Sequence, residues 1–147
     1  MILAGPDETA AAGAALAAVL RPGDVVALSG DLGAGKTTFA RGLLHALGFQ
    51  GEVPSPSFPI VIPYAPPELA IPLWHVDLYR IEDPEELLEL GLDEARADSV
   101  VLIEWPERMG RLLWPDALRL TIAPHGTDAR RLTWEAPAPW EGRWPVR

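Results

Sequence analysis

The sequence predicts an α/β fold in which helices enclose a mixed central sheet. Short apolar runs typical of buried strands alternate with segments of helical periodicity. The run at 24–29 leads into a glycine-rich loop and a helical pattern, and a second run at 99–104 ends in an acid. Alternating segments at 117–123 and 130–135 are joined by a short turn and predict a hairpin. Together these patterns favour a sheet with both parallel and antiparallel strands.

The glycine-rich loop fits the phosphate-binding pattern G-x-x-x-x-G-K-[ST]. Its glycines allow a tight turn that presents backbone N–H groups to phosphate oxygens. Lys36 can reach the β- and γ-phosphates, and the Thr37 hydroxyl can bind Mg²⁺. The nucleotide-binding residues predicted from this loop are Gly30, Asp31, Leu32, Gly33, Ala34, Gly35, Lys36, Thr37 and Thr38.

The surroundings of the loop support this interpretation. Pro22 and Gly23 precede the apolar strand, and after the loop apolar residues at helical spacing continue to a stop at Gly48. Lys36 is the sole lysine of the chain, where every other strongly basic residue is arginine. We therefore predict a three-layer P-loop NTPase fold rather than a simple connecting loop.

Composition limits the remaining possibilities. A chain of 147 residues with 48% hydrophobic residues can form one compact domain, which we place at residues 1–136, followed by a Pro/Trp-rich tail at 137–147. The absence of cysteine excludes disulfides, thiolate metal sites and cysteine nucleophiles. No signal-like start and no long apolar run occur, so a cytoplasmic location is expected.

Charge is distributed unevenly along the chain. The net charge is −9, and residues 76–107 alone hold eleven acids and two arginines, whereas 108–147 hold four acids and seven arginines. An acidic chain is a poor binder of nucleic acid by itself. The basic C-terminal part is either a rim facing nucleotide or a partner, or a set of ordinary solvated arginines.

Residues 7–20 form the first predicted helix, rich in alanine with acids in its first turn.

The segment that follows the loop and its helix carries a candidate sensor of the γ-phosphate. Further on, prolines flank Ser55 and Ser57, which predicts an extended loop followed by a short edge strand. A loop hydroxyl at such a place can sense the γ-phosphate, and Ser57 is the better placed of the two. A proline-stiffened connector is the alternative.

Two acids end predicted strands near the loop. The strand at 71–77 ends at Asp77, where a metal-water ligand or a water-orienting base would lie. His75 in the same strand is expected to be a hydrogen-bonded core residue. The strand at 99–104 ends at Glu104, the expected Mg²⁺ ligand, and Trp105 after it would wall one side of the site.

Two other segments have open interpretations. Residues 82–90 predict a short acidic helix ended by Gly91, either a solvated face or a docking surface for a basic partner. In the tail, Trp140 and Trp144 either pack back on the body or form an adhesive edge for a partner.

The absence of two features limits which class of P-loop protein the chain can belong to. A guanine-reading Asn-Lys-x-Asp motif cannot exist when Lys36 is the only lysine, and residues 76–107 offer too few arginines for a nucleoside-kinase lid. A compact ATPase remains, with little room for a second substrate.

Several motifs in order resemble the TsaE family, also called YjeE. These motifs are GDLGAGKTTFARGLL at 30–44, SPSF at 55–58, HVDLYR at 75–80, LGLDE at 90–94 and LIEWPER at 102–108. The resemblance covers roughly residues 5–135. The P-loop alone is generic, whereas H-x-D-L-Y-R together with I-E-W-P is specific.

The resemblance implies a role for each matching residue. It implies ATP with Mg²⁺ bound by Thr37 and Glu104, and an essential acid at Asp77. Lys36, Asp77 and Glu104 form the implied catalytic set. Trp105, and more loosely Thr9 and Arg130, would contact nucleotide. The family usually has threonine where this chain has Ser57, so the hydroxyl is retained and the methyl is not.

The resemblance also implies partners. Proteins of the family act with TsaB and TsaD, which install threonylcarbamoyl on the adenosine next to the anticodon of tRNA, so tRNA would be reached through those partners. An ATPase that supports this complex is the first hypothesis. A nucleotide-gated binding module that needs no hydrolysis is the second, and a small-molecule kinase is a distant third.

Overall fold

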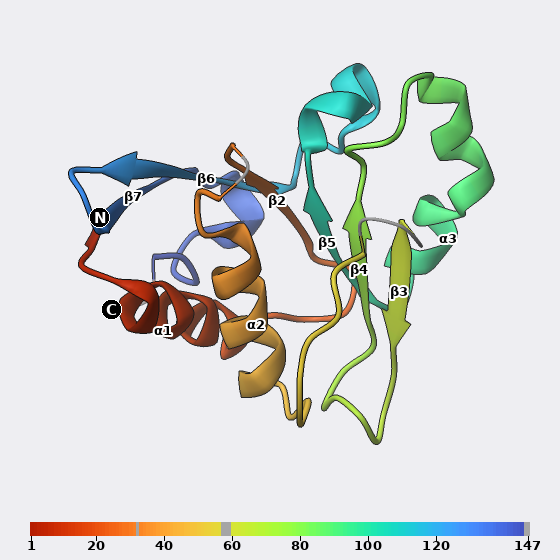
Figure 1. The fold of residues 1–147 in the computed structure, drawn as a ribbon. Helices are drawn as coiled ribbons and strands as arrows, with labels where there is room; N and C mark the ends of the chain where they lie inside the picture. The colour runs from red at the N-terminus through yellow and green to blue at the C-terminus, as the bar shows by residue number, and fades with distance from the viewer. Residues whose placement is uncertain (32, 57–59, 146–147) are drawn as a thin grey trace.

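A single sheet forms the centre of the molecule. The computed structural model describes residues 1–31, 33–56 and 60–145, and in this part of the chain seven strands run in the order β1-β7-β6-β2-β5-β4-β3 (Figure 1). The strands are β1 (Ile2–Leu3), β2 (Val25–Ser29), β3 (Val61–Tyr64), β4 (Leu73–Asp77), β5 (Val100–Glu104), β6 (Leu118–His125) and β7 (Ala129–Glu135).

The predicted mixed sheet is confirmed. The central strands β4, β5, β2 and β6 are parallel neighbours, while β3, β7 and β1 pair antiparallel at the two sides. Strands β2 and β5 are nearly continuous apolar runs because both of their faces are covered for most of their length. The predicted edge strand β3 accepts a proline, Pro63, because an edge strand has fewer backbone bonds to lose.

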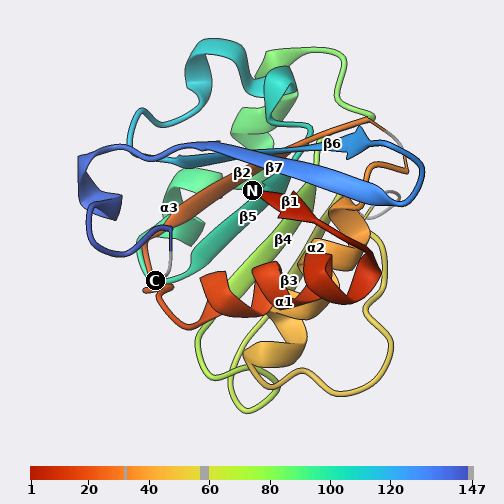
Figure 2. The ribbon, with the colours of Figure 1, turned by 90° about the vertical axis from the view of Figure 1, so that its left-hand side faces the viewer.

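Helical segments form the outer layers. They are α1 (Pro6–Ala17), α2 (Lys36–Ala46), α3 (Leu92–Arg96) and the 3₁₀ segments η1 (Pro84–Leu90), η2 (Pro106–Leu112) and η3 (Ala138–Trp140). One buried cluster joins α1 and α2 to one face of the sheet, and a second joins η1, α3 and η2 to the other face. Figure 2 shows α1 and α2 together on one side of the strands. These are the three layers that the sequence predicts.

Glycines bring α1 and α2 into close contact. A Cβ atom at Gly13 would lie 2.1 Å from the carbonyl oxygen of Phe39, and one at Gly42 would lie 2.1 Å from that of Ala10. Both neighbours are backbone atoms, so the two helices cross at a distance that only glycine permits. This contact holds α2, and with it the loop at its N-terminus, against the body of the protein.

Some boundaries differ from the predictions. The first helix ends at Ala17 instead of residue 20. After Ala17 the backbone N–H groups of Val19 and Leu20 donate to the carbonyl oxygens three residues earlier, so the last turn is tighter than an α-helix. The acidic segment is a 3₁₀ helix whose first turn is capped by the Asp83 carboxylate, and Gly91 ends it in the left-handed conformation, as predicted. Neither β1 nor α3 was predicted, because elements of two and five residues are too short for a periodic signal.

The C-terminal tail packs against the body. Trp140 and Trp144 are 1% and 4% exposed and belong to the cluster on the α1–α2 side. Trp144 contacts Trp134 edge to face, with ring centroids 5.9 Å apart. Arg143 forms an ion pair with Asp24 at the start of β2. Of the two interpretations of these tryptophans, the structure supports packing on the body. In the described residues, no helix is long and apolar enough to cross a membrane.

Candidate nucleotide-binding site

The loop between β2 and α2 has the backbone that a phosphate cradle requires. Gly30, Gly33 and Gly35 have φ values of 155°, 80° and 112°, which favour glycine. At Gly30 a Cβ atom would also lie 2.6 Å from the carbonyl oxygen of Ile122. The loop leads directly into α2, whose N-terminal N–H groups and dipole favour an anion.

Arg130, in β7, holds this loop through its guanidinium group. Its Nε donates to the carbonyl of Ala34 at 2.9 Å, and Nη2 donates to that of Gly33 at 3.4 Å. Thr9 lies behind the loop: it is 2% exposed, its hydroxyl donates to the carbonyl of Gly5, and its methyl group lies 3.7 Å from the place of a Cβ at Gly35. Both residues therefore shape the loop, and Arg130 also borders the pocket in front of it.

Lys36 places a buried cation at the start of α2. The residue is 6% exposed, and its Nζ has no hydrogen-bond partner among the described residues. Nζ lies 3.8 Å from the ring centroid of Trp105 in a cation–π contact. Burial lowers the pKa of Lys36, while the nearby carboxylates of Glu104 and Asp77 oppose that effect. A buried donor with three hydrogens and no acceptor is suited to receive an anion.

Two carboxylates face this cation from neighbouring strands. Asp77 and Glu104 are paired across the parallel strands β4 and β5 and end them at the same edge of the sheet. Each is 6% exposed. Asp77 Oδ1 accepts from the backbone N–H of Tyr79 at 2.9 Å, which orients its carboxylate. The structure thus brings together the two strand-end acids that the sequence singles out.

The chain turns sharply after β5, and this turn places the indole ring of Trp105 over Lys36. Trp105 has φ 58° and ψ 49°, a left-handed conformation that is unusual for a bulky residue. Its ring also packs against Tyr79, with centroids 4.9 Å apart. Trp105 borders the pocket as the sequence predicts.

These elements enclose a pocket of about 260 Å³. Its described lining consists of Gly33, Gly35, Lys36, Thr37, Thr38, Ser55, Asp77, Glu104, Trp105 and Arg130. Of the other predicted residues, Gly30, Asp31 and Ala34 belong to the loop and Thr9 lies behind it, and none of the four lines the pocket. Leu32 and Ser57 lie outside the described residues. Ser55 lines the pocket, and the preference for Ser57 as the sensing hydroxyl stays a prediction.

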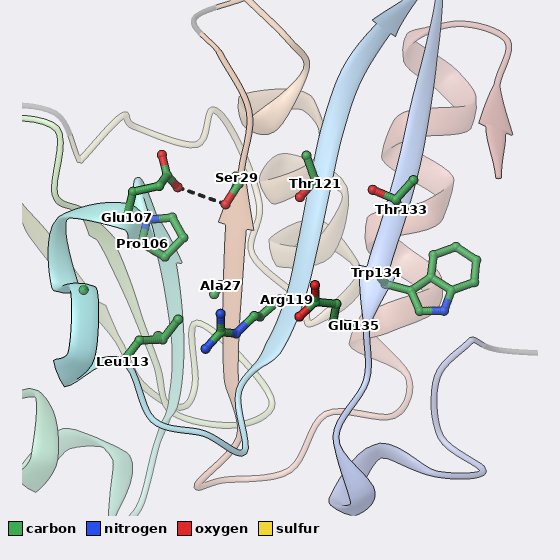
Figure 3. A pocket seen from close by; sticks show the side chains of 11 residues that line it. Ala27, Ser29, Pro106, Glu107, Leu113, Arg119, Thr121, Thr133, Trp134 and Glu135 are labelled. Carbon is green, nitrogen blue, oxygen red and sulfur yellow. Dashed lines mark hydrogen bonds between the residues drawn. The ribbon is translucent and has the colours of Figure 1, made fainter.

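A larger pocket of about 500 Å³ lies elsewhere (Figure 3). It opens on the face of β2, β6 and β7 opposite α1 and α2, and its lining includes Ser29, Arg119 and Thr121. Ser29 donates to Glu107 at 2.9 Å across its edge. The described lining of this larger pocket includes no glycine-rich loop and no buried lysine, so the size of a pocket does not by itself identify the phosphate site.

Fold and loop together define the class: the chain has the three-layer α/β fold of a P-loop NTPase. The crystal structure of YdiB from Bacillus subtilis has the same fold, with a TM-score of 0.78 and 36% identity, covering 92% of this chain and 83% of YdiB.

Sequence comparison identifies the family. The profile described as "Threonylcarbamoyl adenosine biosynthesis protein TsaE" matches residues 3–132. The protein named tRNA threonylcarbamoyladenosine biosynthesis protein TsaE from Bacillus subtilis is 42% identical over 132 residues, which are 89% of this chain and 81% of that protein. The protein of the same name from Streptomyces coelicolor is 49% identical over 113 residues, 75% of each chain. The chain belongs to the TsaE family, which acts in the biosynthesis of threonylcarbamoyladenosine in tRNA.

Proposed function

We propose that the chain is a Mg²⁺-dependent ATPase that supports TsaB and TsaD in the threonylcarbamoylation of tRNA, at the adenosine next to the anticodon. The observation that carries the proposal is the buried ammonium of Lys36, which has no hydrogen-bond partner among the described residues and lies near two strand-end carboxylates, where the glycine loop meets α2. An ammonium without an acceptor is costly to bury. A bound phosphate would supply the hydrogen-bond acceptors that this group lacks.

The residues present fit a nucleoside triphosphate. Glycines 30, 33 and 35 leave backbone N–H groups accessible where side chains would block a phosphate. Adenine is favoured over guanine because Lys36 is the only lysine, which rules out the lysine-containing guanine reader. Trp105 and Tyr79 offer aromatic surface beside the pocket.

The residues also fit a magnesium ion. Among the described residues no group of three or more His, Asp or Glu side chains forms a preformed metal cluster. Magnesium in nucleotide sites is bound by one or two protein oxygens together with phosphates and water, so a small ligand set is what such a site needs. Thr37 and Glu104 would hold the ion, which would neutralise the negative charge of the phosphates.

Each protein group then has a separate task. The loop N–H groups and Lys36 bind and orient the phosphates and stabilise negative charge that develops during transfer. Asp77 is placed to orient water or to accept its proton, since its backbone contact to Tyr79 holds the carboxylate steady. Trp105 covers Lys36 and limits the access of water to it.

Partners would be engaged by protein contacts rather than through tRNA. The net charge of −9 opposes direct binding to a polyanion. ATP hydrolysis in this chain would therefore drive or time a step of the TsaB–TsaD complex, with tRNA held by that complex.

The test is ATP hydrolysis by the purified chain with and without TsaB, TsaD and tRNA. We expect weak turnover alone and faster turnover with the partners. Lys36→Ala and Glu104→Gln should each reduce hydrolysis about 100-fold, while Glu141→Gln, at an exposed carboxylate of the tail, should leave it unchanged. Equal hydrolysis by all four proteins would refute the mechanism.

A variant that binds ATP without cleaving it tests the need for hydrolysis. Asp77→Asn is the variant of choice because it keeps the size of the side chain. If tRNA modification then continues over many turnovers at the full rate, the chain is a nucleotide-gated binding module and not an obligatory ATPase.

A further inference from the structure

A buried histidine contacts the carboxylate at the end of β5. His75 Nε2 lies 2.7 Å from Glu104 Oε2, and the two residues are 2% and 6% exposed. His75 is in β4, two residues before Asp77, so both side chains point to the same face of the sheet. Its cross-strand partner is Leu102, two residues before Glu104. The imidazole therefore lies beneath the two acids, between them and the core.

The contact has a defined polarity. When Glu104 is ionised, its carboxylate can only accept hydrogen bonds, and Nε2 of His75 is then the donor. The other ring nitrogen, Nδ1, is buried and has no hydrogen-bond partner among the described residues. Within the described part of the chain, the ring is thus held by a single polar contact, which is to Glu104.

Packing alone does not account for a histidine at this position. Leu73 precedes it on the same face of β4, and Leu102 lies beside it; both are fully buried. An aliphatic side chain would fill the same layer without leaving a buried nitrogen unpartnered. The feature that a leucine would lack is the hydrogen bond to the carboxylate.

We propose that His75 is a positioning residue for Glu104. By engaging Oε2, it holds the carboxylate in one orientation and leaves Oε1 for the magnesium ion of the bound nucleotide. This inference rests on the proposed function, because it gives the task of Glu104 as metal binding. Partners that orient metal-binding side chains in this way commonly change metal affinity when they are removed.

The experiment measures how nucleotide binding depends on magnesium. The fluorescence of a mant-labelled ATP analogue is titrated against the full chain at increasing MgCl₂ and, separately, in EDTA. His75→Leu should raise the MgCl₂ concentration at half-maximal binding about 10- to 100-fold. Affinity in EDTA should not change, because the phosphate cradle and Lys36 are intact. A general structural defect would instead weaken binding under both conditions.

Matched variants separate positioning from packing. His75→Gln, whose amide nitrogen can take the place of Nε2, should restore the magnesium dependence, whereas the shorter His75→Asn should not. In a Glu104→Gln background, His75→Leu should add no further shift, because both changes remove one interaction. His45→Leu is the control, since its Nε2 bonds only the carbonyl of Gly51 at an exposed position.

The outcomes distinguish this inference from the proposed function. A wild-type chain that binds no nucleotide under either condition would overturn both, whereas equal binding with and without Mg²⁺ would overturn this inference. A wild-type chain that requires Mg²⁺, together with a His75→Leu variant of unchanged midpoint, would overturn this inference alone. If His75→Leu does not fold, the comparison of His75→Gln with His75→Asn decides, and equal midpoints for those two would refute the positioning role.

Discussion

Replacing Gly42 by alanine tests whether the α1–α2 contact positions the phosphate loop. Alanine is the better helix former by about 1 kcal/mol, so propensity alone predicts a more stable protein. The structure predicts the opposite. A Cβ at Gly42 would lie 2.1 Å from the carbonyl oxygen of Ala10 and 2.7 Å from its Cα, both backbone atoms that cannot rotate away.

The size of the effect follows from these two opposing contributions. Relief of the overlap requires α1 and α2 to separate, and overpacking of this kind costs about 1–3 kcal/mol. Because the overlap involves backbone on both sides, we expect about 3 kcal/mol. After subtraction of the propensity gain, the net loss is about 2 kcal/mol, or a fall in Tm of about 4–8 °C.

Urea denaturation and thermal unfolding measure this loss. The control is Ala11→Gly at an exposed position of α1, which should cost only the propensity difference of about 1 kcal/mol. Because α2 begins at Lys36, separation of the helices should also weaken nucleotide binding. A Gly42→Ala variant that is more stable than the wild type would refute the close crossing.

Three further predictions concern the loop and the tail. Burial lowers the pKa of Lys36 below 10.5, so in the pH range between the lowered value and 10.5 the unfolded chain holds a proton that the folded chain has lost. The free energy of unfolding of the nucleotide-free protein should therefore rise with pH through that range. Lys36→Met should abolish this rise, and parallel pH profiles for the wild type and the variant would contradict the prediction. Arg130→Ala removes the bond to Ala34 and should cost about 1.5 kcal/mol and speed amide hydrogen exchange in the loop, whereas Arg131→Ala, exposed on the same strand, should do neither. Trp144→Ala should cost about 3–5 kcal/mol in urea denaturation, and a loss below about 1 kcal/mol would show that the tail does not contribute to the core.

The elements that were predictable are those with a contiguous signal. The apolar runs that became β2 and β5 and the periodic helix α2 are found close to their predicted bounds. The hairpin of β6 and β7 was equally evident from alternation and a turn. By contrast, β1 pairs with β7 through only two residues, so it exists because of its partner rather than its own sequence.

The candidate site was predictable in its parts but not in its internal contacts. Asp77 and Glu104 could be singled out because each ends an apolar run, and the parallel order of β4 and β5 then brings them to one edge. The hydrogen bond from His75 to Glu104 depends on the register of those strands, which neither strand encodes alone. The cation–π contact of Lys36 likewise depends on the left-handed turn at Trp105.

The chemistry of the loop can be read from local sequence, because its glycines, Lys36 and Thr37 lie within residues 30–37 at a spacing that predicts a phosphate cradle. The contacts that support the loop come from distant parts of the chain. Arg130 reaches the carbonyl of Ala34 across 96 positions, and Trp144 packs on Trp134 from a tail without periodicity. Contacts of this kind follow from strand order and helix crossing, which arise only when distant segments bury their apolar faces together.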